Sequence, residues 1–292
     1  MEEAAEFKTV LYQTAFKQTP DIVLFMREDG SILEANQAAV EAYGYSYTEL
    51  VQMNINDLRA DKDNPLIKAQ ITQICSSPYQ FEAVHRRKDG RVFPVEVSSH
   101  SHIIDGQTIL FSIIRDISER KQVENRLRYL ATHDSLTNIP NRYYFEQALQ
   151  HAVAQSEKGL ANSLLFIDLD NFKMVNDTFG HIMGDQLLIN VVGVLRSVLR
   201  KTDTLARLGG DEFAILLEGA SNEEASLVAE KLRAAVEEEE LCLDMYGTYF
   251  KLTISIGIVV IDGKLSSQEM LAYADQALYT AKGCGKNCIK VG

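Results

Sequence analysis

RLGGDEFAILLE, residues 207–218, contains two adjacent glycines, then two adjacent acids, then the apolar run Phe213 to Leu217. Apolar residues on both sides of a Gly-Gly pair predict a β-hairpin with its turn at Gly209-Gly210. Because glycine has no side chain, such a turn lets a ligand approach the backbone, directly beside Asp211 and Glu212. The alternative is a simple turn followed by solvated acids. The hairpin is therefore a candidate ligand site as well as an element of a sheet.

A further acid follows an apolar run some forty residues earlier in the chain. Leu164 to Ile167 predict a short buried strand, and Asp168 stands at its end, where we expect its carboxylate to meet solvent. Mg²⁺ typically binds through one or two carboxylates together with substrate phosphates. Acids on two neighbouring strands can share such ions, which activate an attacking oxygen and stabilise the leaving one. Asp168 and Asp211 are therefore candidate metal ligands.

Several motifs around the hairpin occur in an order that resembles the diguanylate cyclase family, whose signature is GGDEF, here Gly209 to Phe213. The others are HDSLTNIPNR at 133–142, DLDNFKMVNDTFGHIMGD at 168–185 and YADQALYTAKGCGKN at 273–287. The resemblance implies a ferredoxin-like, palm-type βαββαβ core over residues 133–292. It also implies condensation of two GTP into cyclic di-GMP with release of pyrophosphate, with Mg²⁺ or Mn²⁺ as cofactor.

The resemblance implies roles for individual residues. Asp168 and Asp211, with the backbone carbonyl of Leu169, correspond to the metal ligands, and Glu212 is a further acid near the reacting 3′-hydroxyl. The general base stays open between Asp211, Glu212 and a metal-activated hydroxyl that needs none. The other catalytic and substrate-binding residues that it implies are Phe172, Lys173, Asn176, His181, Asp185, Gly209, Gly210, Lys282 and Lys286.

Asn176 and Asp185 resemble the pair that binds the guanine edge, because an amide donates and accepts while a carboxylate accepts from N1–H and N2–H. Gly180 between them is expected to break one helix so that both side chains face one pocket. The resemblance implies that the acid at 185 favours a symmetric guanine product, because family members that make mixed purine products tend to carry a smaller hydroxyl residue at this position. Lys286 stands where the family often has Arg. Lysine keeps the positive charge but lacks the bidentate fork of the guanidinium group, which predicts weaker binding of the triphosphate.

Two further pairs accompany the signature. Arg200 and Asp203, in RKTD, precede the signature with five residues between Asp203 and Gly209, and they resemble the RxxD site where product binds and inhibits; an ordinary surface ion pair is the alternative. Asp134 and Arg207 resemble a pair that ties the end of the linker to the hairpin. Just before Pro140, the segment Asn138-Ile139 replaces the more usual Gly-Leu and leaves the stiffness of the linker open.

Residues 19–116 predict a separate α+β domain. Ile22 to Met26, the turn at Asp29-Gly30 and Ile32-Leu33 form a first hairpin, followed by a helix in AAVEAYG and another near residues 64–76. Turns at 88–90 and 104–106, with Phe93, Val95 and Val97 alternating, predict an antiparallel meander that completes a five-stranded sheet. From DIVLFMREDGSILEAN at 21–36 to RDISERK at 115–121, the segment resembles a PAS sensor domain.

The ligand of this domain is left unknown by the sequence. Cys75 lacks the neighbours of the flavin-adduct motif, which disfavours light sensing through a cysteine. His85, His100 and His102 can ligate iron, but His100 and His102 lie two apart in a strand and merely share a face. We favour structural histidines.

Two helices are predicted outside these domains, at residues 1–18 and in the linker at 117–132. Val123, Leu127 and Leu130 are spaced by four and then three residues, which indicates a short coiled coil or a single amphipathic helix docked on its own domain. A parallel pair of linker helices, together with the sensor domains, predicts a homodimer that sets two C-terminal domains side by side.

Composition excludes some classes of protein. The 292 residues contain 41 Asp and Glu against 29 Lys and Arg, a net charge of −12, which disfavours binding to nucleic acid polymers or anionic membranes. An acidic N-terminus and the absence of an apolar run of ~18 residues predict a cytoplasmic protein without a signal peptide or membrane span. The four cysteines are too scattered for a disulfide framework.

The residues and motifs leave two candidate functions. The first is a homodimeric, PAS-regulated diguanylate cyclase with product feedback through Arg200 and Asp203, in which dimer geometry is the switch. The second is a non-catalytic receptor that binds GTP or cyclic di-GMP and passes the signal to a partner. The intact acids at 168, 211 and 212 favour the enzyme.

Overall fold

The computed structural model describes residues 2–61, 66–242 and 249–292. The chain divides into two compact units, residues 1–125 and 126–292. The first contains an antiparallel sheet with helices and the second a mixed sheet with helices, so the expected α+β class is confirmed. None of the helices in the described ranges is both long and apolar enough to cross a membrane.

The first unit is built on the predicted five-stranded sheet, which is antiparallel throughout and has the order β2-β1-β5-β4-β3. The predicted turn at 88–90 connects β3 to β4. The turn predicted at 104–106 connects β4 to β5 and comprises residues 105–106, because Ile104 still belongs to β4. Phe93, Val95 and Val97 are buried on one face. The strands are β1 (Ile22–Arg27), β2 (Ile32–Ala35), β3 (Tyr79–Arg86), β4 (Val92–Ile104) and β5 (Gln107–Asp116).

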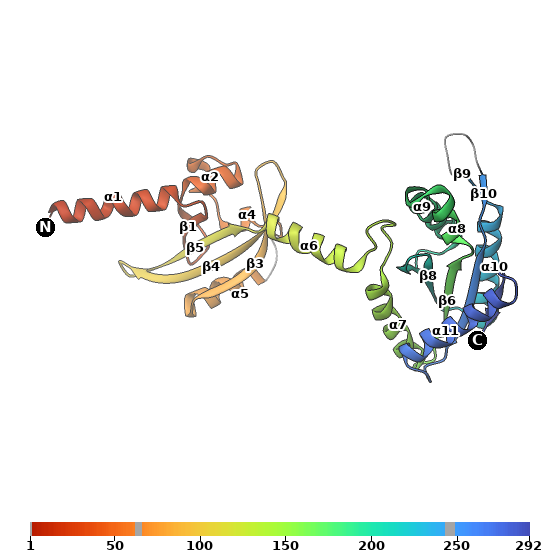
Figure 1. Cartoon of the computed structure of the whole chain (residues 1–292). Helices are drawn as coiled ribbons and strands as arrows, with labels where there is room; N and C mark the ends of the chain where they lie inside the picture. Colours follow the sequence, from red (N-terminus) through yellow and green to blue (C-terminus); the bar gives the residue numbers. More distant parts are fainter. Residues whose placement is uncertain (1, 62–65, 243–248) are drawn as a thin grey trace. The chain divides into compact units, whose positions relative to one another are not determined.

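Short helices flank this sheet (Figure 1), and together with the sheet they enclose a core that includes Leu24, Leu58 and Ile114. They are α2 (Gln37–Tyr43), α3 (Tyr47–Leu50), α4 (Ile55–Leu58) and α5 (Leu66–Ser76). The helix expected near 64–76 is α5, and its first two expected residues lie outside the described ranges. The end of α1 (Glu2–Gln18) approaches the sheet through Phe16, whose ring lies 5.8 Å from that of Phe25.

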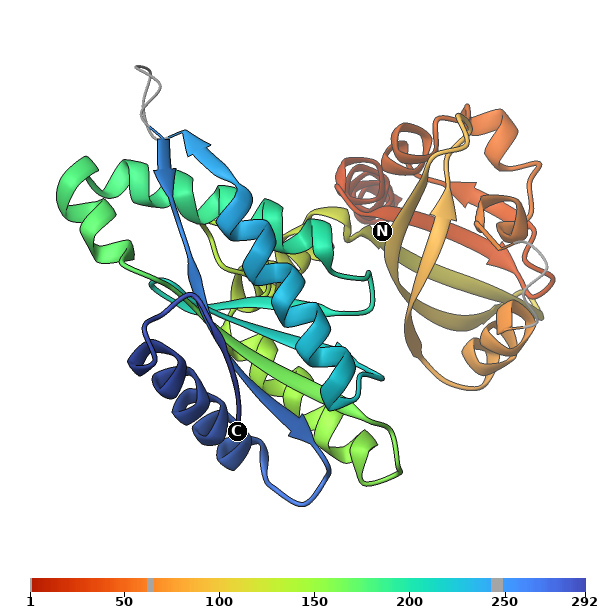
Figure 2. The same ribbon diagram turned by 90° about the vertical axis from the view of Figure 1, so that its right-hand side faces the viewer.

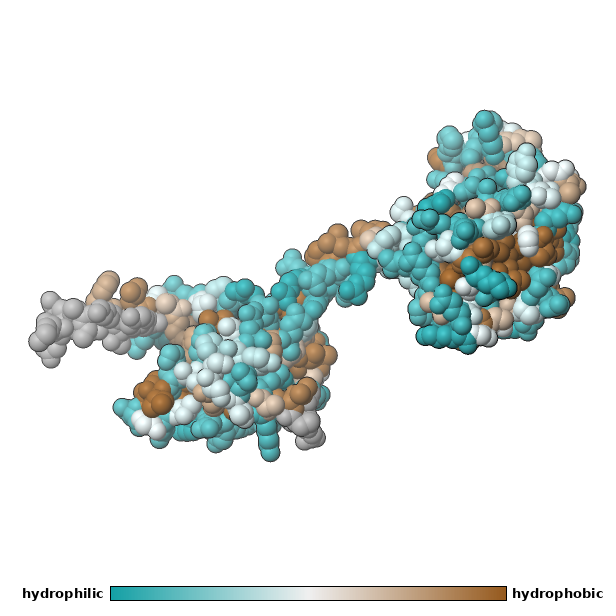
Figure 3. Space-filling model, turned by 90° about the horizontal axis from the view of Figure 1, so that it is seen from below, coloured by the Kyte–Doolittle hydropathy of each residue, from teal (hydrophilic) through white to brown (hydrophobic). Residues whose placement is uncertain are grey.

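The predicted linker helix is α6 (Ser118–Thr132). Its first turn is tied to the sheet of the first unit by ion pairs from Arg120 and Lys121 to Glu82, each at 2.7 Å. Val123, Leu127 and Leu130 are exposed along it, and apolar surface is visible on this helix in Figure 3. An amphipathic helix docked on its own domain would bury these side chains, so their exposure favours the coiled-coil interpretation.

The second unit contains a five-stranded sheet of order β12-β11-β6-β8-β7, antiparallel except between β11 and β12. The succession β6, α9, β7, β8, α10, β11 is the expected βαββαβ core, with α8 inserted before α9. The strands are β6 (Asn162–Leu169), β7 (Thr204–Gly209), β8 (Glu212–Glu218), β11 (Ile254–Ile261) and β12 (Ile289–Val291), and β9 (Glu240–Cys242) pairs with β10 (Tyr249–Lys251) separately.

Helices cover both faces of this sheet (Figure 2). One core, with Leu187, Val191 and Leu232, joins the sheet to α8 (Phe172–Phe179), α9 (His181–Val198) and α10 (Asn222–Glu238). The other, with Phe145 and Leu278, joins it to α7 (Arg142–Ser156) and α11 (Ser267–Gly283). The central strand β6 is buried along its whole length, so polar groups in it must find partners.

Candidate functional site

Two of the predicted acids face each other across the central strands. Asp168 on β6 is the register partner of Glu212 on β8, directly beyond the buried pair Ile167 and Phe213. Asp168 lies within β6 and is only 7% exposed, so the expectation that it stands past the strand and meets solvent is wrong. The reason is that β8 and β11 flank β6 as far as this position, where Ser255 pairs with Asp168 on the other side.

Asp211 lies at the tip of the β7–β8 hairpin. The two turn residues are Gly210 and Asp211, so the predicted turn at Gly209-Gly210 was wrong by one residue. The ladder shifts between Arg207 and Gly209, and the Nε and Nη2 atoms of Arg207 donate to the carbonyl of Gly210 at 3.0 and 2.8 Å. The backbone N–H of Leu169 donates to the carbonyl of Asp211 at 3.3 Å, which fixes the turn against the end of β6.

The environment of Asp168 disfavours an isolated negative charge. Burial raises the pKa of its carboxyl to about 6, and the negative charges of Asp211 and Asp170 act in the same direction. The Nζ atom of Lys282 lies 2.7 Å from Oδ2 of Asp168 and opposes that rise. A carboxylate that is buried beside other acids favours a bound cation.

The arrangement fits a divalent metal that is held partly by its substrate. Asp168, Asp211 and the carbonyl of Leu169 offer hard oxygen ligands, which suit Mg²⁺. In the part of the chain that the structure describes, no three His, Cys, Asp or Glu side chains gather closely enough to form a complete metal site. The remaining ligands would have to be substrate phosphates or water, which is the usual mode of Mg²⁺ in nucleotide-binding sites.

Two residues that the motifs did not single out, Arg142 and Asp170, also belong to the surroundings of the acids. Nη2 of Arg142, the first residue of α7, lies 3.6 Å from Oε2 of Glu212, and its Nε donates to the carbonyl of Leu208 at 3.1 Å. Asp170 is 3% exposed and accepts from the hydroxyls of Thr253 and Ser255, each at 2.8 Å. Arg142 ends the HDSLTNIPNR motif and Asp170 belongs to DLDN. Their place in these motifs was the one feature of the sequence that could have identified them as residues of the site.

Asn176 and Asp185 lie on either side of a sharp corner between two helices. Gly180, with φ of +84°, ends α8 and begins α9, as expected. Asn176 lies against Gly184, because a Cβ atom on Gly184 would be 1.9 Å from Oδ1 of Asn176. Asp185 is the next residue and is exposed. The corner therefore brings the amide of Asn176 close to the backbone that carries Asp185, above the buried ring of Phe172.

The basic candidates come from different elements, and the structure shows a contact with the acids for Lys282. Lys282, on α11, contacts Asp168 directly, whereas Nζ of Lys286 donates to Oδ1 of Asn171 at 2.6 Å. Lys173 and His181 are exposed, on α8 and at the start of α9. The four side chains therefore come from three places: α8, the α8–α9 corner, and the C-terminal end of α11 with the loop after it.

Arg200 and Asp203 lie in the loop between α9 and β7. Oδ2 of Asp203 accepts from the backbone N–H of Arg200 at 2.8 Å, and no ion pair between the two side chains occurs in the described part of the chain. The alternative of a surface ion pair is therefore not what holds this loop. The loop borders an open pocket lined also by Tyr144, Arg196, Thr204 and Glu218.

The predicted pair of Asp134 and Arg207 is present, with Nη1 of Arg207 3.0 Å from Oδ1 of Asp134. The unusual Asn138-Ile139 segment also has a physical explanation. Asn138 has φ of +55°, a left-handed conformation that asparagine tolerates better than most residues, and Ile139 is buried in the core. The segment before Pro140 therefore keeps the backbone shape that glycine would allow.

In the first unit the candidate histidines do not converge. His85, on β3, is fully buried, and its Nδ1 lies 2.7 Å from the hydroxyl of Tyr43. His100 and His102 alternate on β4 with the buried positions Val97 and Ser99, and therefore lie on the opposite face of the sheet. This supports the structural interpretation for His100 and His102, and it argues against an iron site shared by the three histidines; within the described part of the chain, the one hydrogen-bond partner of the His85 ring is Tyr43 on Nδ1.

Comparison with known proteins is informative for both units. Residues 131–288 match the family described as "Diguanylate cyclase, GGDEF domain", and residues 20–119 match a PAS domain family. The chain is 32% identical over 275 residues to diguanylate cyclase DgcM of Escherichia coli K12, covering 92% of this chain and 65% of DgcM. It thus spans about two thirds of the length of that relative.

Two further matches concern the second unit. The probable diguanylate cyclase DgcT of E. coli K12 is 41% identical over 163 residues, which are 56% of this chain and 36% of DgcT. A crystal structure of the coiled coil and GGDEF domain of DgcB from Caulobacter crescentus, in complex with c-di-GMP, superimposes with a TM-score of 0.58 at 30% identity. It covers 60% of this chain and 93% of that one.

Proposed function

The chain belongs to the family of GGDEF-domain diguanylate cyclases and carries a PAS domain ahead of that domain, and from its site we propose a PAS-regulated diguanylate cyclase. The reaction joins two GTP into cyclic di-GMP. In each half-reaction the 3′-oxygen of one GTP forms a bond to the α-phosphorus of the other. The bond to the β-phosphate breaks and pyrophosphate leaves, while the proton of the 3′-hydroxyl is lost.

The observation that carries this proposal is the convergence of acids from two strands. Asp168 and Glu212 are register partners, and Asp211 lies at the adjoining turn close enough to raise the pKa of Asp168. A structural role alone does not explain why a buried strand carries Asp168 beside the negative charges of Asp211 and Asp170, since their repulsion costs stability. Binding of a cation and a polyphosphate relieves that repulsion.

Each group has a role in this proposal. Mg²⁺, held by Asp168, Asp211 and the carbonyl of Leu169, would polarise the phosphate and activate the attacking oxygen. Asn176 and Asp185 bind the guanine edge, and the buried ring of Phe172 supports the helix corner from below. Lys173, Lys282 and Lys286 offset the negative charge of the triphosphate.

We also propose that the active form is a homodimer. Each GGDEF domain binds one GTP, so two half-sites must meet before either 3′-hydroxyl can reach the other nucleotide. The exposed Val123, Leu127 and Leu130 of α6 support a parallel helix pair that would bring the domains together. A signal at the PAS domain would shift the population of productive pairs without changing any catalytic group.

Product feedback is the last part of the proposal. Cyclic di-GMP carries two phosphates, and Arg200, with Arg196 in the same open pocket, offers guanidinium groups that match phosphate geometry. Because Asp203 accepts from the backbone of Arg200 and not from its guanidinium, that guanidinium is available to the product.

The test is chromatography of nucleotides after incubation of the purified chain with GTP and Mg²⁺ over a range of protein concentrations. We expect cyclic di-GMP, with a rate per chain that rises with concentration. Asp211→Asn should abolish synthesis, while the control Asp177→Asn, at an exposed position on α8, should retain it. Synthesis by the Asp211 variant would refute the assignment, and binding of GTP without turnover under every condition would favour a receptor.

A further inference from the structure

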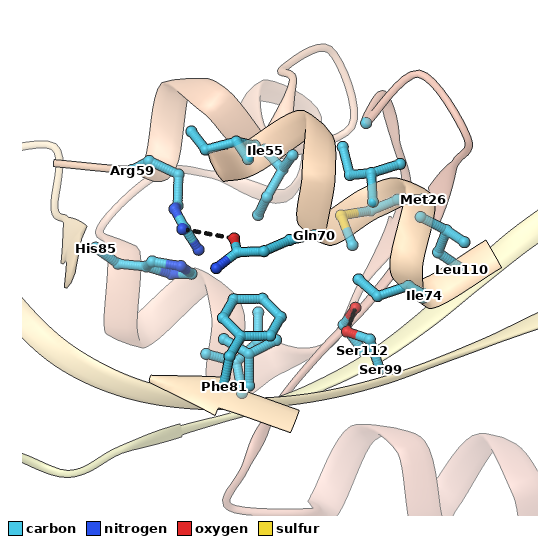
Figure 4. Close-up of a pocket in the computed structure, with 15 residues that line it drawn as sticks. Met26, Ile55, Arg59, Gln70, Ile74, Phe81, His85, Ser99, Leu110 and Ser112 are labelled. Carbon is cyan, nitrogen blue, oxygen red and sulfur yellow. Dashed lines mark hydrogen bonds between the residues drawn. The ribbon is translucent and has the colours of Figure 1, made fainter. Parts of the chain in front are cut away.

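The PAS domain encloses a small cavity between its sheet and helices α4 and α5 (Figure 4). Its wall is mostly apolar, with Met26, Ile55, Ile74, Phe81 and Leu110 among the lining side chains. The volume of the cavity that is open to the centre of a water-sized sphere is about 30 Å³. At ~10–15 Å³ for each water molecule, this is the space of two or three waters. A porphyrin or a flavin ring is far larger.

Arg59 and His85 both extend into this cavity, one from the end of α4 and one from β3 (Figure 4). Arg59 is 5% exposed and His85 is fully buried. One guanidinium nitrogen of Arg59, Nη2, donates to Oε1 of Gln70 at 2.9 Å. Nε of Arg59 and Nε2 of His85 are buried and have no hydrogen-bond partner within the described ranges.

The tautomer of His85 follows from its neighbour. The hydroxyl of Tyr43 is buried, and Nδ1 of His85, at 2.7 Å, is its hydrogen-bond partner. A buried O–H group needs an acceptor, so Tyr43 donates to Nδ1 and the proton of the neutral ring resides on Nε2. Burial lowers the pKa of His85 to about 3, which keeps the ring neutral at physiological pH. Among the residues that the structure describes, two N–H groups in one cavity, on Arg59 and His85, therefore have no acceptor.

The positive charge of Arg59 indicates which kind of hydrogen-bond acceptor would suit the cavity. Burial lowers the pKa of Arg59, and the negative charge of Asp61 opposes that shift. Arginine nevertheless stays protonated in proteins, so its charge is retained in an apolar enclosure. A buried donor without a partner is costly, and a charged one more so. An anionic acceptor with two oxygens would satisfy the donors of both side chains.

We propose that this cavity binds a short aliphatic monocarboxylate, whose two oxygens accept from Nε of Arg59 and Nε2 of His85. Its hydrocarbon part would contact Ile55, Ile74 and Leu110, and the available space limits it to a chain of about two or three carbons. This deepens the proposed function, because it names the chemical class of signal for the sensor domain. Binding itself does not depend on cyclase activity.

The first test is isothermal titration of the 292-residue chain, without GTP, with sodium acetate and sodium propionate at constant ionic strength. Acetamide and propionamide are the matched neutral ligands, because they keep the shape and lose the charge. We expect saturable binding of the carboxylates, at least about tenfold tighter than that of the amides, since charge-assisted hydrogen bonds are about twice as strong as neutral ones. Propionate should bind up to about fourfold tighter than acetate, and hexanoate should not bind.

Equal binding of acids and amides, or saturation by neither, would overturn the proposal and leave water as the partner of the two donors.

The second test is Arg59→Gln, which should weaken binding of acetate at least about tenfold. The control is Arg91→Gln, because Arg91 is an exposed arginine of the same domain that pairs with Asp89. The affinity of this variant for acetate should equal that of the natural chain. If Arg59→Gln does not fold, the comparison of acids with amides on the natural chain decides alone. If the chain binds acetate but makes no cyclic di-GMP, the proposed cyclase activity is refuted and the proposed carboxylate site in the PAS domain is retained.

Discussion

Replacing Gly184 with alanine should weaken binding of GTP without unfolding the domain. The new Cβ would lie 1.9 Å from Oδ1 of Asn176 and 3.2 Å from Cζ of the Phe172 ring. Non-bonded contacts of this kind rarely fall below about 3 Å, so the amide of Asn176 must move by about 1 Å or rotate away. That displacement removes the hydrogen bonds proposed between Asn176 and the guanine edge.

The loss can be estimated from the strength of such bonds. A neutral hydrogen bond contributes about 0.5–1.5 kcal/mol, and losing one or two of them corresponds to a rise of roughly tenfold in the KM for GTP. Because the contact is made equally in the ground state and the transition state, kcat should stay within about twofold. Steady-state kinetics of pyrophosphate release over a range of GTP concentrations measures both.

The same helix offers a matched control. Gly193 also lies on α9, and a Cβ there would meet no atom within 4 Å. Both substitutions replace glycine by alanine inside a helix, which on its own favours folding by up to about 1 kcal/mol. If Gly184→Ala and Gly193→Ala have the same KM for GTP, Asn176 does not bind the nucleotide and the guanine-binding role assigned to this corner is wrong.

Three other outcomes are expected. The low pKa of buried His85 means that the unfolded chain binds a proton below about pH 6.5 and the folded chain does not, so urea unfolding of the PAS domain should show stability falling from pH 7 to pH 5. His85→Gln should flatten that dependence. Arg200→Ala should raise the concentration of cyclic di-GMP that halves synthesis by at least about tenfold, while Lys201→Ala should not; equal inhibition of both would remove the feedback site. Asp170→Asn should lower the free energy of unfolding by about 1–3 kcal/mol, against no change for Asp177→Asn.

The sequence predicted the fold because its signals are local. A period of two in β4, glycine-containing turns at 88–90 and 105–106, and the apolar run of β6 are each readable within a few residues. The separation of Asn176 from Asp185 by Gly180 is equally local, since a glycine with positive φ ends one helix and begins the next. Each of these features depends on neighbours in the chain.

The errors concern partners that are distant in the chain. Asp168 was expected to meet solvent, and what buries it is the extent of β8 and β11 beside it, which lie forty or more residues away. The turn at Gly210-Asp211 was misplaced by one residue, and the distant contact that fixes it is the hydrogen bond from the backbone N–H of Leu169 to the carbonyl of Asp211, at 3.3 Å. The cavity of Arg59 and His85 likewise joins segments whose sequences show no period or motif in common.

The two acids of the DLD segment show why residue type alone does not identify a site. Asp168 and Asp170 are both buried; Asp168 is the last residue but one of β6, and Asp170 directly follows the strand. Asp170 accepts from Thr253, from Ser255 and from the backbone N–H of Asn287, at 2.8, 2.8 and 3.0 Å, so hydrogen bonds from protein groups compensate its burial. Asp168 has Lys282 on one oxygen, and its pKa stays raised. The charged form of Asp168 is therefore not fully compensated by protein groups, so this acid can gain stability from a bound cation. Asp170, two residues later, is of the same type, and only the folded structure distinguishes the two.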